Sequence, residues 1–180
     1  MAKMKSVIKL EVGNILLFEG DAIVNSANKS LLRGSGLCGA IHKAAGVQQL
    51  HAACHALGGC ETGDAKTTEA FDLPCKWIIH AVGPNWHRHT PSEATALLKQ
   101  TYQAIFREVA LYKIERLAIP AISTGIYGFP ADLAAEISIC EVTAGVEANP
   151  ELKEVCLIYS ETGKYNLTRQ VFEAHNAKMG

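Results

Sequence analysis

The chain has 180 residues, which is enough for one compact domain with a substantial core and too few for two ordinary ones. Hydrophobic residues make up 48% of it and charged residues 19%, a balance typical of a globular enzyme or binding domain. The 17 basic and 18 acidic side chains nearly cancel, so we expect one domain over residues 1–180 and no nucleic-acid partner, which would require a basic excess.

The first half of the chain alternates between strand-like and helix-like periodicity. Segments 6–12 and 22–27 are predicted to be strands, the second with the continuous apolar start of a buried strand. Segment 39–57 carries an apolar stripe at helical spacing and is predicted to be one helix. Two more strands are predicted at 64–71 and 77–83, separated by a turn.

A long helix is then predicted over 92–112, with Ser92 as its N-cap. The apolar segment 114–123 is predicted to be a buried strand. Pro120 lies within it and lacks a backbone N–H, so this strand would need an edge position or a bulge.

Three elements complete the chain. Pro130 suits the first turn of a helix predicted over 130–146. A strand at 152–160 and a closing helix at 165–178 follow. The resulting order β-β-α-β-β-α-β-α-β-α predicts a three-layer α/β/α sandwich with a mixed, largely parallel central sheet.

The apolar content also bears on cellular location. No stretch reaches about 18 consecutive apolar residues, so we expect no membrane span, and the N-terminus lacks the apolar run of a signal peptide. The six cysteines form no C-x-x-C pair, which suits free thiols in a reducing cytoplasm. Cys75, Cys140 and Cys156 lie in or beside apolar runs and are expected to be small core residues. We therefore expect a cytoplasmic protein and a monomer.

Residues 34–39 read GSGLCG and satisfy G-x-G-x-x-G, the dinucleotide-binding fingerprint when it joins a strand to a helix. The preceding strand is predicted to end near residue 27, and no strand end with an acidic residue follows about twenty positions later. This context disfavours a nicotinamide cofactor. A glycine cluster before a helix still exposes backbone N–H groups, and the helix dipole favours an anion there.

A second glycine-bearing loop, residues 123–128 (STGIYG), also follows a buried strand and leads to a helix. The carboxyl ends of parallel strands meet at one edge of a sheet, so the two loops could hold one ligand with two phosphates. Two independent tight turns are the alternative.

Four segments, read together, resemble the macrodomain family, which binds ADP-ribose: IVNSANKSL (23–31), GSGLCGAIHKAAG (34–46), IIHAVGPNW (78–86) and AIPAISTGIYGFP (118–130). They occur in the family's order and spacing. The likeness is greatest to single-domain hydrolases of mono-ADP-ribose and O-acetyl-ADP-ribose. It implies that ADP-ribose, ADP-ribosylated protein or O-acetyl-ADP-ribose is the partner, and we expect no cofactor.

The resemblance implies roles for residues of both loops. Asn28 would bond the distal ribose, although an asparagine there could instead bond its own loop. Asn25 is expected to close the turn. Tyr127 would shield the distal ribose or orient a water, and a core tyrosine is the alternative. The loops around the distal ribose and the diphosphate would be formed by Gly34, Ser35, Gly36 and Leu37 on one side and by Ser123, Thr124, Gly125 and Ile126 on the other.

Adenine is expected beside Gly13-Asn14-Ile15, where the family has G-D-I. The Asn14 carbonyl would accept a hydrogen bond from the adenine amine without the charge of an aspartate, which would lower affinity. Tyr159, at the end of the last predicted strand, could stack on the base.

Cys38 is the departure with the largest consequence, because the hydrolytic branch has an aspartate there that positions or activates the attacking water. A neutral thiol, with a reference pKa of about 8.5, is a poor base near pH 7. Three hypotheses follow. Hydrolysis could proceed with the ligand's own phosphate holding the water, the domain could bind without turnover, or Cys38 could be a nucleophile or redox switch activated by His42. His42 lies in the family's G-A-I-H motif, so packing or hydrogen bonding is its simpler role. The candidate catalytic residues are Asn28, Cys38 and Tyr127.

The segment HAACHALGGC brings four residues of types that bind zinc within ten positions: His51, Cys54, His55 and Cys60. The segment lacks paired cysteines and falls on a predicted surface helix, so chance proximity is favoured. We expect no bound metal.

Overall fold

The computed structural model of the protein describes residues 7–179, so residue 6 of the first predicted strand and both ends of the predicted domain 1–180 lie outside the described residues. Within 7–179 the strands are β1 (Ile8–Val12), β2 (Ala22–Ser26), β3 (Ala65–Glu69), β4 (Trp77–Ala81), β5 (Arg116–Ile119) and β6 (Glu154–Tyr159). The helices are α2 (Gly36–Ala45), α3 (Val47–Leu57), α4 (Pro91–Leu111), α5 (Ala131–Ala148) and α6 (Thr162–Met179), with short 3-10 helices η1 (Ile15–Leu17) and η2 (Trp86–Arg88).

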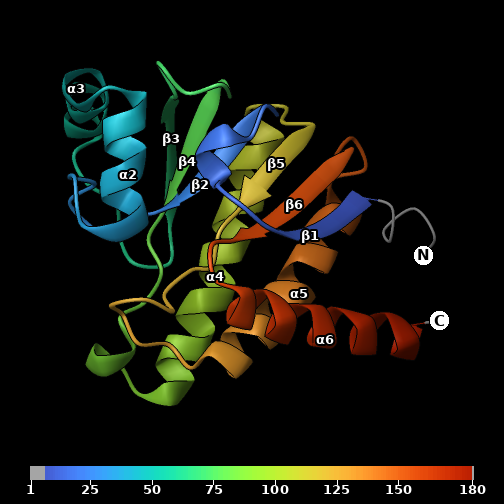
Figure 1. The fold of residues 1–180 in the computed structure, drawn as a ribbon. Coiled ribbons are helices and arrows are strands. Elements are labelled where there is room, and N and C mark those ends of the chain that lie inside the picture. Colours follow the sequence, from blue (N-terminus) through green and yellow to red (C-terminus); the bar gives the residue numbers. More distant parts are fainter. Residues whose placement is uncertain (1–6, 180) are drawn as a thin grey trace.

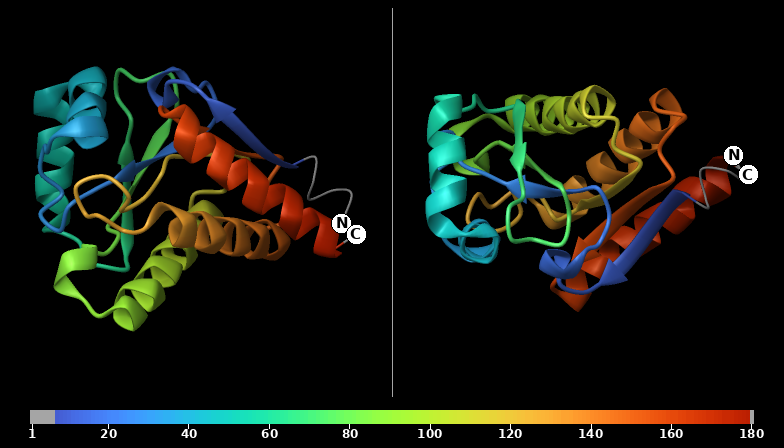
Figure 2. Two further views of the ribbon diagram at one scale, coloured as in Figure 1. Left: turned by 60° about the horizontal axis from the view of Figure 1, so that its bottom comes forward. Right: turned by 90° about the horizontal axis from the view of Figure 1, so that it is seen from above.

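The strands form a six-stranded sheet in the order β1-β6-β5-β2-β4-β3. Neighbouring strands are parallel except β3 and β4, which are antiparallel. Figure 1 shows α2 and α3 on one side of the sheet and α4, α5 and α6 gathered on the other, and the view from above in Figure 2 shows the same separation. The predicted three-layer α/β/α sandwich with a mixed, largely parallel sheet is confirmed.

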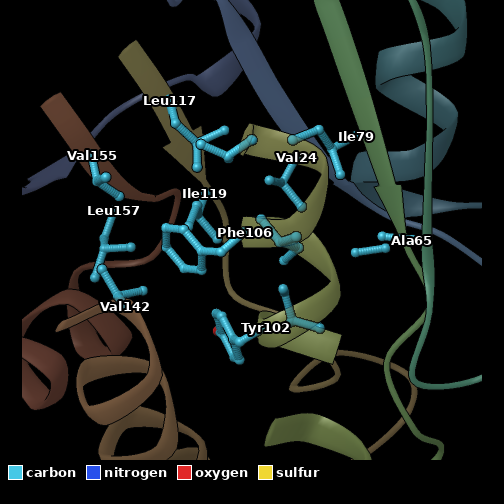
Figure 3. Close-up of a cluster of buried hydrophobic side chains, with 14 of the residues drawn as sticks. Val24, Ala65, Ile79, Tyr102, Phe106, Leu117, Ile119, Val142, Val155 and Leu157 are labelled. Carbon is cyan, nitrogen blue, oxygen red and sulfur yellow. The ribbon is translucent and has the colours of Figure 1, made fainter. Parts of the chain in front are cut away.

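Two cores lie on the two faces of the sheet, because successive strand side chains point to opposite faces. Ile23 of β2 packs into the core under α2 and α3, whereas its neighbour Val24 packs into the core under α4 and α5. Figure 3 shows the second core, where the Phe106 ring of α4 lies among aliphatic side chains of the strands and Val142 of α5. The continuous apolar start of β2 thus supplies both cores.

The predicted single helix over 39–57 is wrong in its continuity. Gly46 separates α2 from α3 and adopts a φ of 109°, which an L side chain rarely tolerates and which interrupts the helical backbone. The first of the two helices also begins at Gly36, earlier than expected, so it starts inside the glycine-bearing loop.

The predicted N-cap of the long helix is wrong by two residues. Thr90, not Ser92, caps α4: its hydroxyl accepts a hydrogen bond from the Glu93 N–H, and the Glu93 carboxylate accepts one from the Thr90 N–H. This capping box satisfies two backbone groups at the helix start, and Pro91 occupies the first helical position, where its missing N–H costs nothing.

The prediction that Pro120 needs an edge or a bulge is also wrong. β5 lies in the interior of the sheet, between β6 and β2, but it ends at Ile119. Pro120 therefore comes one residue after the strand, where no ladder hydrogen bond requires its N–H.

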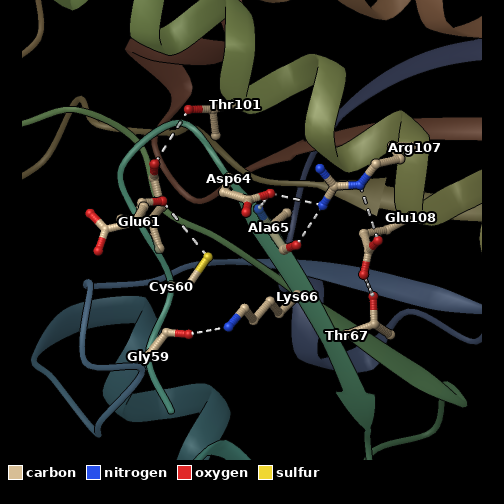
Figure 4. A network of polar contacts seen from close by, with 11 residues as sticks. Gly59, Cys60, Glu61, Asp64, Ala65, Lys66, Thr67, Thr101, Arg107 and Glu108 are labelled. Carbon is tan, nitrogen blue, oxygen red and sulfur yellow. Dashed lines mark hydrogen bonds and ion pairs between the residues drawn. The ribbon is translucent and has the colours of Figure 1, made fainter. Parts of the chain in front are cut away.

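A polar network joins the edge strand β3 to α4 (Figure 4). Arg107 donates to the Asp64 carboxylate and to the Ala65 carbonyl, both at 2.8 Å, and the buried Glu108 accepts a hydrogen bond from Thr67 at 3.0 Å. Burial would raise the pKa of Asp64, but hydrogen bonds from the Ala65 N–H and from Arg107 outweigh it and lower the pKa. The network fixes the outer strand and lies away from the glycine-bearing loops.

The cysteine predictions hold in two of three cases. Cys75 and Cys156 are buried as expected, but Cys140 is exposed on the outer side of α5, so its prediction as a core residue is wrong. Within residues 7–179, no helix combines the length and apolarity that a membrane crossing requires.

Candidate functional site

A cavity of about 600 Å³ lies at the carboxyl ends of β1, β6, β5 and β2. These strands are neighbours and parallel, so the loops that leave them converge on one edge of the sheet. The cavity is lined by all of the residues that the sequence singled out for ligand binding or catalysis: Asn14, Ile15, Asn28, Gly34, Ser35, Gly36, Leu37, Cys38, Ser123, Thr124, Gly125, Ile126, Tyr127 and Tyr159.

Asn28 belongs to the loop between β2 and α2, and its side chain braces that loop. Its Oδ1 accepts hydrogen bonds from the Ser30 hydroxyl at 2.7 Å and the Leu32 N–H at 3.2 Å, and its Nδ2 donates to the Leu32 carbonyl at 3.0 Å. The bonding within its own loop, stated above as an alternative, is therefore present. The second N–H of the amide has no partner in the described residues, so Asn28 can also donate to a ligand in the cavity.

The helix α2 begins directly in the cavity wall. Ser35 is its N-cap, but the Ser35 side chain makes no capping hydrogen bond, and Gly36 adopts a φ of 59°. The first N–H groups of a helix have no partner within the helix, and here no capping side chain occupies them. This loop therefore offers several donors and the positive end of the helix dipole to an anion.

The loop between β5 and α5 forms the opposite wall and carries local strain. Ser123 has a φ of 65°, a conformation that costs a non-glycine residue about 1 kcal/mol or more. The buried hydroxyls of Ser123 and Thr124 have no hydrogen-bond partner in the described residues. The Tyr127 carbonyl accepts a bond from the Trp86 N–H at 2.8 Å, which ties the loop to η2. Buried hydroxyls without a partner are unusual, and both belong to residues that line the cavity.

Asn14 lies at the other end of the cavity, where β1 ends. Its Oδ1 accepts a hydrogen bond from the Leu16 N–H at 3.0 Å and so caps η1. Because a backbone N–H can only donate, this bond identifies the engaged atom as the oxygen and leaves Nδ2 as the other polar group of the side chain. The side chains of Ile15 and Ile158 add apolar wall next to it.

Tyr159 lines the cavity but is buried, so only a small part of it can contact a ligand there. Its side chain belongs to the core under α4 and α5. Burial raises the pKa of Tyr159, against the opposing effect of hydrogen bonds with Thr168 and Ser138. The ring is therefore anchored toward α5 and α6, and the structure places it beneath the cavity rather than free within it.

Cys38 is the cavity end of a chain of polar contacts that runs into the core. Its Sγ lies 3.7 Å from the Leu32 carbonyl, to which it donates, and 3.8 Å from the Asn25 Nδ2. Asn25 also lies 3.1 Å from the Nδ1 of His80, so the expectation that Asn25 closes a turn is wrong: it is fully buried within β2. The His80 Nε2 lies 2.9 Å from the Thr68 hydroxyl.

Both buried histidines beneath the cavity are held in the neutral form. Burial, assisted by the neighbouring His42, lowers the pKa of His80 to about 3. Burial, then the positive charges of Arg33 and His51, lower the pKa of His42. Neutral His80 can accept at Nδ1 from Asn25 and donate at Nε2 to Thr68, which fixes one tautomer. The ring nitrogens of His42 have no hydrogen-bond partner in the described residues.

The four candidate metal ligands of segment 51–60 do not converge on one point. Cys54 is fully buried and lies 3.8 Å from the His80 Nε2, whereas His51 and His55 are exposed and stack on each other on the outside of α3. Within residues 7–179, no three His, Cys, Asp or Glu side chains are arranged to hold a metal ion.

Sequence reasoning missed several residues of the cavity wall, and the charged ones matter most. Glu161 and Lys164, at the start of α6, line the cavity beside Ser160. The available signal was positional: the carboxyl end of β6 joins the same edge as the glycine-bearing loops, so the polar residues after it belong at the same site.

The fold and the cavity together define an α/β/α ligand-binding domain with a site at the carboxyl edge of its sheet. The model of the Macro domain family matches residues 24–138. The chain therefore belongs to the macrodomain family.

Known members of the family support the comparison over nearly the whole chain. An O-acetyl-ADP-ribose deacetylase from Pantoea vagans is 41% identical over 170 residues, covering 91% of this chain and 96% of that protein. A macrodomain from Oceanobacillus iheyensis, solved with MES bound, superposes with a TM-score of 0.91 at 32% identity, covering 97% and 95% of the two chains. A Trypanosoma brucei macrodomain in complex with ADP-ribose gives a TM-score of 0.83 at 30% identity, covering 91% of this chain and 68% of that one.

Proposed function

We propose that the protein binds ADP-ribose in this cavity and hydrolyses mono-ADP-ribosyl-protein esters or O-acetyl-ADP-ribose. The observation that carries the proposal is the cavity itself. The start of α2 and the loop after β5 face it from two sides, each with donors that no described residue occupies. A diphosphate is an anion that such paired donor loops hold well.

The ligand would lie along the cavity from β1 to the loop after β2. Adenine would occupy the apolar end beside Asn14 and Ile15, and the diphosphate would lie between the two loops. The distal ribose would then reach Asn28 and Tyr127, where the free N–H of the Asn28 amide can donate to a ribose hydroxyl.

Hydrolysis would proceed by attack of one water molecule. In a mono-ADP-ribosyl-protein ester, water attacks the anomeric carbon: the C–O bond to the acceptor carboxylate breaks as the new C–O bond forms, and the water proton passes to solvent at neutral pH. In O-acetyl-ADP-ribose, water would attack the ester carbon instead and release acetate, with the ribose oxygen taking up a proton. The Cys38 thiol donates a hydrogen bond to the Leu32 carbonyl and accepts one from the Asn25 amide. It therefore holds its proton as a donor and is not arranged to take a proton from water as a base. Orientation of the water would therefore fall to the ligand's phosphate and to Asn28.

Binding without turnover is the second candidate function, and one observation favours it. Among the described residues that line the cavity, the sole carboxylate is Glu161, on the side of α6 and not beside Asn28 and Cys38. A cavity without a carboxylate at the reacting end lacks a general base there. The reader would recognise ADP-ribosylated proteins through the same contacts.

One experiment separates the two functions. A mono-ADP-ribosylated acceptor protein is incubated with the unchanged protein and with the Asn28→Ala and Cys38→Asp variants, and loss of the label is followed. Loss with the unchanged protein and none with Asn28→Ala supports the hydrolase. Tight ADP-ribose binding by calorimetry without label loss supports the reader. If the protein neither binds ADP-ribose nor removes the label, both functions are rejected. A gain of activity in Cys38→Asp would show that the missing carboxylate limits the rate of hydrolysis in the unchanged protein.

The cellular setting expected from the sequence belongs to the same proposal. The protein would act in the cytoplasm as a monomer on ADP-ribosylated proteins or O-acetyl-ADP-ribose. Gel filtration combined with light scattering tests the monomeric state directly.

A further inference from the structure

Lys164 lies where the first turns of α6 meet the cavity. Its side chain is only 26% exposed, and its Nζ lies 3.7 Å from the Glu161 Oε2, one turn earlier. The Glu161 side chain is 66% exposed. The ammonium group is thus held at the cavity wall by a carboxylate that is itself mostly in water.

Lys164 also lies close to the loop that follows β5. A second, small cavity of about 20 Å³ is lined by Lys164 together with Thr124, Ala121 and Tyr159. All four of these residues line the large cavity as well. The Lys164 side chain therefore lies close to Tyr159 and to the loop that carries the unpaired Thr124 hydroxyl.

The charge of the cavity wall makes this placement significant. In the described part of the chain, the lining residues other than Lys164 and Glu161 have uncharged side chains. ADP-ribose carries two negative charges on its diphosphate. Backbone N–H groups can solvate those charges, but one cationic side chain is available to neutralise them.

We propose that Lys164 is a ligand-binding residue of this cavity, which exchanges its ion pair with Glu161 for the anionic diphosphate region of the ligand. The inference rests on the proposed binding of ADP-ribose. It assigns the electrostatic part of recognition to α6, outside both glycine-bearing loops.

The exchange is favourable because the two partners differ in exposure and charge. An ion pair with a water-exposed carboxylate contributes little, because water screens the attraction and holding two long side chains in place costs entropy. A diphosphate shielded from water by the cavity walls is the stronger partner, since charge-assisted hydrogen bonds gain strength away from water. Glu161 would then lower the affinity slightly, by competing for Lys164 and by repelling the ligand.

The test is calorimetric titration with ADP-ribose at several salt concentrations. Lys164→Met should weaken binding about tenfold at low salt, which is the loss of one charge-assisted contact. It should also flatten the dependence of Kd on salt, because a screened attraction has been removed. Lys164→Arg should restore both the affinity and the salt dependence. Glu161→Gln should tighten binding up to about threefold.

Lys178→Met provides the matched control. Lys178 is exposed on the same helix and does not line the cavity, so this variant makes the same change in net charge and should bind like the unchanged protein. Thermal melting checks that each variant is folded.

Three results would overturn the inference. Lys164→Met could bind within twofold of the unchanged protein, or it could lose affinity with the salt dependence intact, which would assign Lys164 a packing role. Equal losses in Lys164→Met and Lys178→Met would indicate a general charge effect. If the unchanged protein does not bind ADP-ribose at all, the proposed function fails and the inference fails with it, which separates that case from the other three.

Discussion

The Cα of Gly39 packs against the carbonyl oxygen of Gly34, so closely that a Cβ at residue 39 would clash with that oxygen. The contact joins the first turn of α2 to the loop that forms one cavity wall. We expect Gly39→Ala to displace the backbone around Gly34, because a carbonyl cannot rotate away as a side chain can. ADP-ribose affinity should fall at least tenfold by calorimetry.

The matched control for this prediction is Gly163→Ala. Gly163 lies in the first turn of α6, and a Cβ there meets no atom within 4 Å. This variant should bind ADP-ribose like the unchanged protein and melt at or slightly above its temperature, since alanine favours a helix. Unchanged affinity in Gly39→Ala would show that the wall can adapt.

A second prediction concerns the end of the cavity that is proposed to hold adenine. The Asn14 oxygen already accepts a hydrogen bond from the Leu16 N–H, so the adenine amine would have to share this one neutral acceptor. In Asn14→Asp, one oxygen keeps the cap and the other can accept from that amine. We expect about tenfold tighter binding of ADP-ribose, the typical gain from a hydrogen bond to a charged group.

The control for Asn14→Asp is a ligand that lacks the amine. The purine analogue of ADP-ribose without the 6-amino group should bind the unchanged protein and Asn14→Asp with similar affinity. An equal gain for both ligands would contradict the proposed contact and indicate a general effect of the added charge.

The sequence predicts the site better than the element boundaries, for a physical reason. Glycines 34 and 36 and the polar loop after β5 form local patterns, and parallel strands bring such loops together at one edge. The helix break at Gly46 depends on a φ of 109° that the apolar stripe does not reveal. The role of Lys164 depends on where α6 crosses the sheet, which no local pattern encodes.

The buried Asn25 and His80 show a second limit. Both lie in segments predicted to be strands, 22–27 and 77–83, and the structure confirms those strands. Their hydrogen bond joins residues 55 positions apart in the sequence, across the pair β2 and β4. Sequence patterns on single strands cannot predict such a pairing, because it depends on strand order and register.

A third prediction tests helix packing on the face opposite α2. Gly145 of α5 lies against the Phe106 ring of α4, and a Cβ at residue 145 would clash with that ring. Gly145→Ala should lower the free energy of unfolding by about 1–3 kcal/mol, the usual cost of overpacking a core. Urea denaturation measures the change, and the slope with urea should stay the same.

The double variant Gly145→Ala with Phe106→Leu checks the assigned cause. Leucine removes the ring that the new methyl group meets, so the two changes should cost less together than the sum of their separate costs. If the two losses of unfolding free energy simply add, the strain of Gly145→Ala does not come from contact with the Phe106 ring.

A fourth prediction follows from the neutral His80. In the unfolded chain this histidine takes up a proton near pH 6.5, but in the folded protein its pKa is lowered to about 3. Between these values the unfolded state binds more protons, so stability falls as the pH is lowered from 6.5. His80 contributes up to about 1.4 kcal/mol per pH unit to this slope, and His42, whose pKa is also lowered, adds to it.

Urea denaturation at several pH values between 4.5 and 7.5 measures the slope. His80→Gln should lower stability at pH 7.5, because glutamine reproduces the contacts with Asn25 and Thr68 imperfectly, yet it should flatten the fall below pH 6.5. His55→Gln is the control: His55 is exposed on α3, and its replacement should leave the slope unchanged. An undiminished slope in His80→Gln would mean that His80 binds its proton in the folded state over the same range.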